Sequence, residues 1–337
     1  MARSGPLRGR VPHRGARAAA VRGDRGRPVH RARDAAPPGA RRIARIGGAA
    51  RVTRPYAEVI GDPIAQSKSP AIHTYWLGKL GIAADYRACH VTAEGLADYL
   101  AARRRDPHWR GCNVTMPHKQ AVMPLLDRLD RQAQAIGAVN TIVPEGGGML
   151  AGYNTDAGGF LEPLRPALAQ RHLFRMARIM GTGGAARAIV SALAGENFVL
   201  VLAGRDPAKA GALLDELAPQ GDHHAIALDH FADPTDFPFD DREGCFDLVV
   251  NASPLGMAGQ KPLALDLSHV PPGSVIYDIV THPLDTPLLQ AARAAGFETV
   301  DGLAMLIGQA ALAFEKFYGT APPRDDRDAG LRRMLAA

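Results

Sequence analysis

Residues 175–186 read RMARIMGTGGAA, and helix-forming residues continue from there to Leu193. The stretch Arg175–Met180 is typical of a short buried strand, and it runs directly into a GxGxxA turn that opens a helix. Glycines at such a turn permit its tight backbone and leave N–H groups at the helix N-terminus to bind a pyrophosphate. We therefore expect a dinucleotide-binding unit, although a glycine-rich turn also occurs as a packing element.

The next strand candidate, Phe198–Leu202, is followed by Ala203-Gly204-Arg205-Asp206. An NAD site usually carries an acidic residue at this strand end, whereas a small residue followed by Arg accommodates the 2′-phosphate of NADP. This favours NADP, with Arg205 on the adenine and Lys209 as a second cation, unless both side chains are simply solvated. The Asp206 carboxylate would oppose the phosphate, but as the N-cap of a helix beginning at Pro207 it would point away.

Outward from this loop, short β-branched runs alternate with helical stretches, which predicts an α/β fold with mostly parallel strands. The first unit is expected to contain strands at Tyr56–Ile60, Tyr86–Val91 and Gly111–Thr115 and helices at Pro70–Leu80 and Ala93–Arg105. A hinge near Gly152–Gly159 and a helix over Phe160–Gln170 precede the second unit. The apolar spacing of Leu303–Phe317 predicts a last long helix packed inward.

The composition is that of a globular protein of two domains: 337 residues, 46% hydrophobic, 22% charged, with a formal net charge of +6. Three widely spaced cysteines suggest neither a disulfide framework nor a metal site, and favour a reducing cytoplasmic location. The sequence has neither an apolar run that would span a membrane nor the apolar core of a signal peptide. We expect no metal ion and no membrane partner.

The positive charge lies in residues 1–54, which hold 15 Arg and 2 Asp, so that the rest of the chain sums to −7. This segment has no aromatic residue and no sustained apolar period, and we expect it to be disordered. Three alternatives remain: a basic arm for nucleic acid, a transit peptide, or a dispensable extension. Because it lacks aromatics for base stacking, we expect no nucleic-acid partner.

Small polar residues gather in the first unit, in four short segments. They are Ser67-Lys68-Ser69-Pro70, Asn113-Val114-Thr115-Met116-Pro117-His118-Lys119, Asn140-Thr141 and Asn154-Thr155-Asp156. Together they are typical of a site for a polyhydroxylated anion, which needs uncharged donors and acceptors and one proton-transfer pair. Lys119 and Asp156 are the candidate pair, and an ordinary interdomain ion pair is the alternative.

At this point the motifs resemble those of the shikimate dehydrogenase family. The resemblance is colinear from about Tyr56 to Gly319 and is carried by the following strings. They are Val59-Ile60-Gly61-Asp62-Pro63-Ile64, Ser67-Lys68-Ser69-Pro70, Asn113-Val114-Thr115, Gly137-Ala138-Val139-Asn140-Thr141, Asn154-Thr155-Asp156, Gly181-Thr182-Gly183-Gly184-Ala185-Ala186-Arg187, Asn251-Ala252-Ser253-Pro254-Leu255-Gly256-Met257 and Asp301-Gly302 with Met305, Leu306 and Gln309.

The resemblance implies an N-terminal α/β substrate-binding domain, a Rossmann-type NADP-binding domain and a cleft between them. The implied division is a leader over 1–54, the substrate domain over 55–156, the cofactor domain over 157–300, a returning helix over 301–320 and a tail over 321–337. The implied reaction is the reversible reduction of 3-dehydroshikimate to shikimate with NADPH, on the pathway to chorismate and the aromatic amino acids. A homodimer is left open.

The resemblance also implies roles for individual residues. Lys119 and Asp156 form the catalytic dyad. Substrate contacts are implied for Ser67, Ser69, Asn113, Thr115, Lys119, Asn140, Asp156, Thr281 and Gln309. Cofactor contacts are implied for Gly181, Thr182, Gly183, Gly184, Ala185, Arg205, Lys209, Ile279, Gly302 and Met305.

Two departures from the family pattern bear on specificity. Thr281 stands where a tyrosine usually helps to hold the substrate carboxylate, and Asp206 adds a negative charge to the adenine segment. An NAD-dependent quinate/shikimate dehydrogenase is therefore the alternative function. His118 is not expected to be catalytic, because neighbours in an extended segment point to opposite sides.

Overall fold

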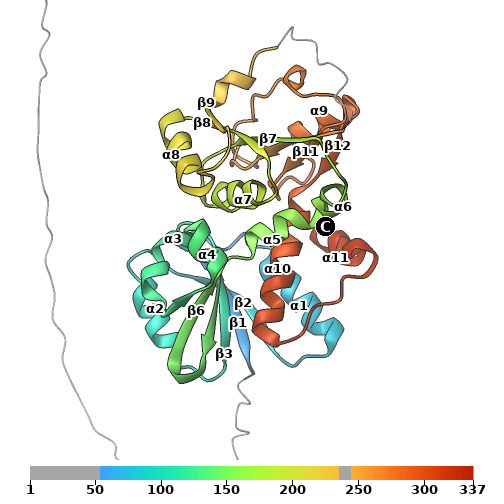
Figure 1. The fold of residues 1–337 in the computed structure, drawn as a ribbon. Coiled ribbons are helices and arrows are strands. Elements are labelled where there is room, and N and C mark those ends of the chain that lie inside the picture. The colour runs from blue at the N-terminus through green and yellow to red at the C-terminus, as the bar shows by residue number, and fades with distance from the viewer. Residues whose placement is uncertain (1–53, 235–243, 337) are drawn as a thin grey trace, which may run out of the picture. The chain divides into compact units, whose positions relative to one another are not determined.

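The computed structural model describes residues 54–234 and 244–336 (Figure 1). The expectations for the Arg-rich leader over 1–54, including its disorder and its lack of a nucleic-acid partner, fall almost entirely outside the described residues. None of the described helices is both long and apolar enough to cross a bilayer.

The first sheet is mixed, with the strand order β2-β1-β3-β5-β6-β4. The strand β1 pairs in parallel with β2 and β3, whereas β5 is antiparallel to both β3 and β6. Every residue of β1 is buried, as expected for a strand with a neighbour on each side. The strands are β1 (Tyr56–Gly61), β2 (Asp85–His90), β3 (Trp109–Val114), β4 (Arg128–Leu129), β5 (Thr141–Glu145) and β6 (Met149–Tyr153).

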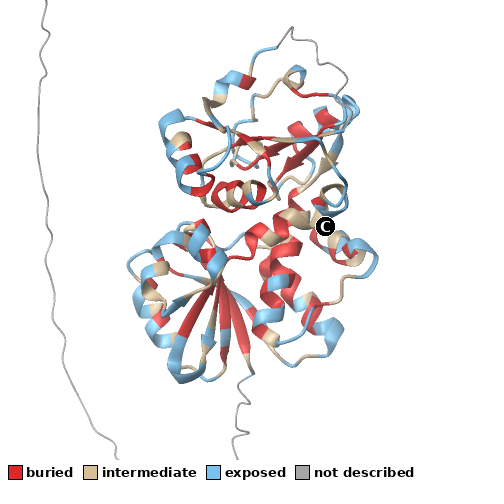
Figure 2. Ribbon diagram, viewed as in Figure 1, coloured by how far each residue is buried: buried red, intermediate tan, exposed pale blue. Residues whose placement is uncertain are grey.

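Helices from both ends of the described chain cover this sheet. The core beside β1 joins Ile72 and Trp76 of α1 to Leu303, Ile307 and Phe314 of α10. Figure 2 shows the buried faces of the strands and of α10 turned toward this core. The helices are α1 (Ser69–Leu80), α2 (Leu96–Arg103), α3 (His118–Ala121), α4 (Arg131–Ile136), α10 (Gly302–Tyr318) and α11 (Ala329–Ala336).

The second sheet is parallel throughout, with the order β12-β11-β10-β7-β8-β9. Counted from β7, this is the order of the Rossmann fold, so the predicted α/β class with a dinucleotide-binding unit is confirmed. The elements are β7 (Phe174–Met180), α7 (Gly184–Gly195), β8 (Val199–Gly204), α8 (Pro207–Leu217), β9 (His224–Ala227), β10 (Cys245–Asn251), β11 (Val275–Asp278), α9 (Pro287–Ala294) and β12 (Glu298–Val300).

The connection between the sheets differs from the predicted continuous helix over Phe160–Gln170, and that prediction is wrong. The chain instead forms α5 (Asp156–Leu161), a 3-10 turn over Glu162–Leu164 and α6 (Arg165–Leu168). Pro163 and Pro166 lie at the starts of the second and third pieces. Proline has no N–H and clashes with the preceding turn, so it restarts a helix rather than continuing one.

A buried carboxylate links β1 to α2 and β2. Glu58 is 1% exposed and accepts hydrogen bonds from Arg103 Nε at 2.7 Å, Tyr99 Oη at 2.7 Å and Arg87 Nε at 3.0 Å. Burial alone would raise the pKa of Glu58, but the bonds from Arg103, Tyr99 and Arg87 outweigh it and lower the pKa below 4.5. The ionised carboxylate therefore stabilises the fold.

We expect Glu58→Gln to lower the free energy of unfolding at pH 7 by about 2–3 kcal/mol, because two guanidinium groups lose their shared carboxylate. The folded-state pKa is the lower one, so this contribution is present above the unfolded-state pKa and is lost as the pH falls through the folded-state pKa. Urea unfolding at pH 7 and at lower pH measures it. The control Glu145→Gln, at a partly exposed ion pair with Arg128, should cost less than about 1 kcal/mol. An equal loss in both variants would contradict the prediction.

Candidate active site

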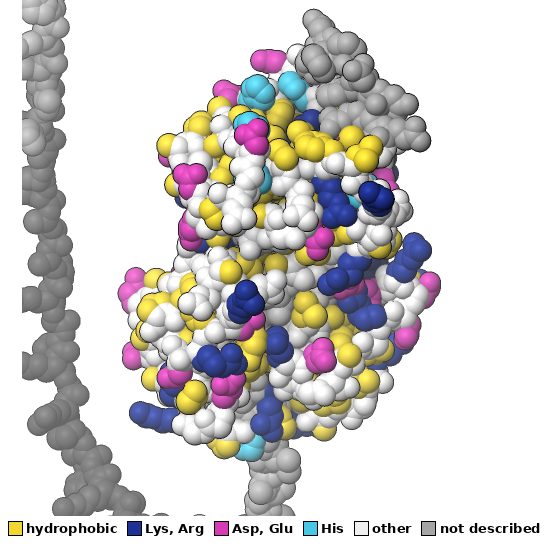
Figure 3. Space-filling view, in the orientation of Figure 1, with side chains coloured by type: hydrophobic (Ala, Val, Ile, Leu, Met, Phe, Trp, Pro, Cys, Tyr) yellow, Lys and Arg dark blue, Asp and Glu magenta, His cyan; other side chains and the backbone are white. Residues whose placement is uncertain are grey.

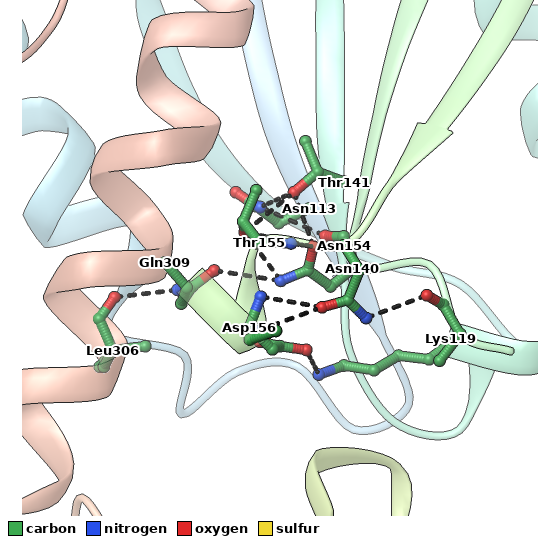
Figure 4. Close-up of polar contacts among 11 residues, drawn as sticks. Asn113, Lys119, Asn140, Thr141, Asn154, Thr155, Asp156, Leu306 and Gln309 are labelled. Atoms are coloured by element: carbon green, nitrogen blue, oxygen red, sulfur yellow. Dashed lines mark hydrogen bonds and ion pairs between the residues drawn. The ribbon is translucent and has the colours of Figure 1, made fainter. Parts of the chain in front are cut away.

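Polar side chains from three neighbouring strands meet at one edge of the first sheet (Figure 4). Asn113 lies near the end of β3, Asn140 immediately precedes β5, and Thr155 follows β6. Because β5 is antiparallel to both neighbours, its start lies beside their ends, and the register pairs Asn113 with Thr141 and Thr141 with Tyr153. The predicted polar segments are thus brought together by strand direction.

Lys119 and Asp156 are in contact at this edge. Lys119 Nζ donates to Asp156 Oδ2 at 2.7 Å, and the two side chains are 15% and 7% exposed. The predicted contact is therefore present. The Lys119 side chain remains partly exposed, so the carboxylate orients the ammonium group without burying the side chain completely. Their catalytic role stays a prediction.

Asn154 positions the carboxylate of this pair. Its Oδ1 accepts from the Asp156 N–H at 3.0 Å, and its Nδ2 donates to Ala138 O at 2.9 Å. This is an Asx turn that starts α5 at Asp156. The backbone carbonyl of Lys119 in turn accepts from the Val139 N–H at 2.8 Å, so the same segment holds both members of the pair.

Asn140 is the centre of the amide network. Its Oδ1 accepts from the Thr155 N–H at 2.8 Å, and its Nδ2 donates to Thr155 Oγ1 at 2.9 Å and to Gln309 Oε1 at 3.5 Å. Gln309 comes from α10, which approaches α5 closely at Gly159. A Cβ on Gly159 would lie 2.3 Å from Gln309 N, so only glycine permits this approach.

Asn113 is held by a residue that the sequence did not single out. Tyr86 Oη on β2 donates to Asn113 Oδ1 at 2.6 Å, while Asn113 Nδ2 donates to Thr141 Oγ1 at 3.1 Å. The Tyr86 ring stacks on His73 with centroids 3.9 Å apart, and burial lowers the pKa of His73 to about 3, which keeps that ring neutral. The only sequence signal for Tyr86 was an aromatic residue in a strand.

The two candidate serines lie at the start of α1. The Ser69 N–H donates to Ser67 Oγ at 3.3 Å. Thr115 follows β3, with its methyl group against Gly61.

The glycine loop has the geometry of a phosphate cradle. Gly181 has a φ of +118°, and a Cβ there would lie 2.8 Å from Ala252 O. A Cβ on Gly183 would meet nothing within 4 Å, so the loop is open on that side. It leads into Gly184 and Ala185 at the start of α7, whose first N–H groups have no partner within the helix. These residues fit a dinucleotide.

The adenine segment lies at the end of β8. Asp206 is the N-cap of α8, and its carboxylate accepts from the N–H groups of Ala208 at 3.0 Å and Lys209 at 3.3 Å. The predicted N-cap is confirmed, and the negative charge is directed to the helix start. Arg205 and Lys209 are exposed cations, and the methyl group of Thr182 lies against Gly204, the residue before Arg205.

Three further candidate cofactor residues gather at the end of β11. A Cβ on Gly302 would lie 2.3 Å from Val280 O and 2.6 Å from Ile279 O, and Met305 is buried in the core against which Ile279 packs. Thr281 follows directly, but the hydrogen bonds of the Asn140 network among the described residues do not include it.

His118 is buried, and its Nε2 lies 2.6 Å from Val91 O. That contact joins α3 to the end of β2 and gives the imidazole a structural role beside Lys119. It agrees with the expectation that His118 is not the proton-transfer group.

Comparisons with known proteins agree with this geometry. The family model "Shikimate dehydrogenase substrate binding domain" matches residues 59–142. The shikimate dehydrogenase (NADP(+)) of Sphingopyxis alaskensis is 52% identical over 284 residues, which are 84% of this chain and 97% of that protein. The chain belongs to the shikimate dehydrogenase family.

Solved structures extend the comparison. A shikimate 5-dehydrogenase from Thermus thermophilus in complex with NADP(H) and shikimate superimposes with a TM-score of 0.70 at 34% identity, covering 83% of this chain and 99% of that one. A quinate dehydrogenase from Corynebacterium glutamicum in complex with NAD gives a TM-score of 0.68 at 32% identity, covering 84% and 97%. The similar structures thus include both a shikimate dehydrogenase bound to NADP(H) and a quinate dehydrogenase bound to NAD.

In this shikimate dehydrogenase family member, we expect Tyr86→Phe to raise the KM for shikimate about tenfold with little change in the KM for NADP+. The phenol holds Asn113 Oδ1, and removing this buried donor leaves that oxygen without its partner, so that the bonds from Nδ2 alone fix the amide less firmly. Steady-state kinetics and a thermal melt measure the two effects separately. Tyr56→Phe, which removes a phenol hydrogen bond to Asp106 at the start of β1, away from the site, is the matched control. Identical kinetics for Tyr86→Phe and wild type would contradict the assignment.

Proposed function

We propose that Lys119 and Asp156 are the proton-transfer pair with which this NADP-dependent shikimate dehydrogenase interconverts shikimate and 3-dehydroshikimate. The 2.7 Å contact between Nζ and Oδ2 carries the proposal, because it lies where Asn113, Asn140 and Gln309 converge. The reaction belongs to the pathway to chorismate and the aromatic amino acids.

Lys119 handles the proton at the C3 oxygen of the substrate. NADPH, when bound, supplies the hydride that reaches C3. As the carbonyl oxygen gains negative charge, the Lys119 ammonium donates a proton to it, and solvent restores that proton to the amine. In the reverse direction the neutral amine accepts the hydroxyl proton.

Asp156 orients the lysine and accepts a hydrogen bond from the neighbouring substrate hydroxyl. Because the Asx turn fixes the Asp156 backbone and Lys119 binds its carboxylate, the pair needs little reorganisation during the reaction, which is the advantage of a preorganised site. Asn113, Thr115, Asn140 and Gln309 then contact the ring hydroxyls and the carboxylate. Ser67 and Ser69 hold the carboxylate, with Thr281 reaching it directly or through a bridging water.

The coenzyme site spans the glycine loop and the end of β8. We propose that Gly181, Thr182, Gly183, Gly184 and Ala185 contact the pyrophosphate, and that Ile279, Gly302 and Met305 contact the nicotinamide end. Arg205 stacks on the adenine, and Lys209 adds a second cation near the 2′-phosphate. The N-cap bonds of Asp206 support NADP, because they direct the carboxylate to the helix start.

We further propose the domain division 55–156, 157–300 and 301–320. The two sheets and the packing of α10 against α1 support it. A cytoplasmic location is supported by the cysteines Cys89, Cys112 and Cys245, which are free thiols. Sedimentation equilibrium decides between a monomer and a homodimer.

We expect Lys119→Met to lower kcat by about 10²- to 10⁴-fold, the usual contribution of a positioned proton-transfer group. The affinity for NADP+, measured by fluorescence titration, should stay within about twofold because the cofactor contacts are elsewhere. Asp156→Asn should also lower kcat. Lys79→Met, an exposed lysine on α1, is the control, and retention of activity by Lys119→Met would refute the assigned dyad.

Coenzyme and substrate choice are tested with a matrix of shikimate and quinate against NADP+ and NAD+. We expect the highest kcat/KM with shikimate and NADP+. Arg205→Ala should lower the value for NADP+ by about 10- to 100-fold, the effect of losing a charged contact, and leave that for NAD+ nearly unchanged. Arg171→Ala controls for charge, and a wild-type preference for quinate with NAD+ would favour the alternative function.

A further inference from the structure

Helix α11 (Ala329–Ala336) lies within the segment predicted from the sequence as a tail, and it completes the core of the first lobe. Leu331 and Leu335 are 1% and 8% exposed and belong to the cluster that contains Ile72 of α1. Its Gly330 lies against the Tyr75 hydroxyl, since a Cβ at that glycine would be 2.7 Å from the oxygen. The helix is therefore seated on α1.

The same helix receives the side chain of Lys68. Lys68 Nζ donates to Leu335 O at 2.9 Å, across 267 positions of the chain. This carbonyl is in the last turn of α11, where the C=O groups have no partner within the helix and the helix dipole is negative. Lys68 is also the residue between Ser67 and Ser69, and its own carbonyl accepts the Ile72 N–H at 3.1 Å.

A second contact joins α11 to the start of α10. Arg332 Nη1 lies 2.8 and 3.1 Å from the two carboxylate oxygens of Asp301. Asp301 is the N-cap of α10 and accepts from the Leu303 N–H at 3.0 Å. One short helix thus contacts both the serine segment and the helix that carries Gln309.

The approach to α11 is also held by ion pairs. Arg324 Nη2 lies 2.6 Å from Glu162 Oε1 and 2.7 Å from Asp328 Oδ2, and Asp328 is only 8% exposed. Figure 3 shows basic and acidic side chains gathered over the region that Figure 1 labels α11 and α6. These contacts leave α11 anchored at both of its ends.

We propose that α11 is a positioning element for the subsite that binds the substrate carboxylate, and that Lys68 acts through α11 and not on the substrate. This inference rests on the proposed roles of Ser67 and Ser69. With its ammonium bound to Leu335 O, Lys68 ties the backbone between the two serines to the core.

The physical reason is preorganisation of a short loop. Ordering a residue costs conformational entropy, and a loop that is ordered before binding does not incur this cost when the substrate arrives. Releasing Lys68 from α11 should therefore weaken shikimate binding. It should leave kcat and the coenzyme site unchanged, because the hydrogen bonds that α11 makes to the described chain go to Lys68 and Asp301, whereas Lys119 is bound to Asp156.

The experiment is a double-mutant cycle in the full chain, with shikimate oxidation by NADP+ as the readout. The variants are Lys68→Met, a chain that ends after Met334 and so lacks the accepting carbonyl, and the two changes combined. We expect each single change to raise the KM for shikimate about tenfold, the effect of losing one charged hydrogen bond. The combined variant should be no worse than either, and kcat and the KM for NADP+ should stay within about twofold.

The control and the contradicting outcomes are specific. Arg333→Met removes an exposed cation from the same helix and should leave the KM unchanged. If Lys68→Met raises the KM by the same factor in the shortened chain as in the full one, Lys68 acts directly on the carboxylate and the proposal is wrong. Unchanged KM in Lys68→Met also overturns it.

Two further measurements keep the test decisive. If the shortened chain fails to fold, Arg332→Met loosens α11 at its Asp301 contact, and the effect of Lys68→Met should be smaller in that background; an undiminished effect overturns the proposal. If wild type itself does not oxidise shikimate with NADP+, it is the proposed function that fails. The two failures can therefore be told apart, because the inference about α11 is contradicted only by variants of a chain whose wild type is active.

Discussion

The ion pair between Lys119 and Asp156 is the constraint around which the site is arranged. A charge removed from water must be paired and hydrogen-bonded, or it is expelled or neutralised. Here the lysine comes from the short helix after β3 and the carboxylate from the first residue of α5. Because α5 is also the start of the connection to the second sheet, the pair that would carry the chemistry lies where the two halves of the described chain join.

The buried polar side chains around that pair are uncharged amides and hydroxyls. The side chains of Asn113, Asn140, Asn154 and Thr155 are buried, and each is engaged with a partner in the protein. A fully satisfied network in a region of low dielectric is rigid, whereas one missing partner leaves a costly orphan. The tight packing of α10 on α5 at Gly159 serves the same end, because it sets how far Gln309 reaches toward Asn140.

Features with a local sequence signature were predictable. The GxGxxA turn after an apolar strand predicted the Rossmann-type sheet, and Asp206 before Pro207 predicted an N-cap, which removed the apparent conflict with NADP. The interruption at Pro163 also had a local signature, because proline cannot continue a helix, and the predicted single helix over Phe160–Gln170 is wrong for that reason. The polar residue types already indicated Lys119 and Asp156 as the pair, with an ordinary interdomain ion pair as the alternative, and the family resemblance favoured the catalytic role.

Tyr86 and α11 were beyond such reasoning, because their importance lies in contacts between distant parts of the chain. A tyrosine in an edge strand and a short amphipathic stretch have many possible partners. Only the register of β2 on β1 and the packing of α11 on α1 select one.

The packing of α11 on α1 has an electrostatic consequence for Lys68. The Lys68 ammonium is bound by the partial negative charge at the end of a helix. Under the roles proposed for Ser67 and Ser69, a substrate carboxylate would therefore meet only hydroxyl and N–H groups in this segment. Recognition would then depend on the geometry of neutral donors, and a helix distant from the reacting atoms would bear on substrate binding.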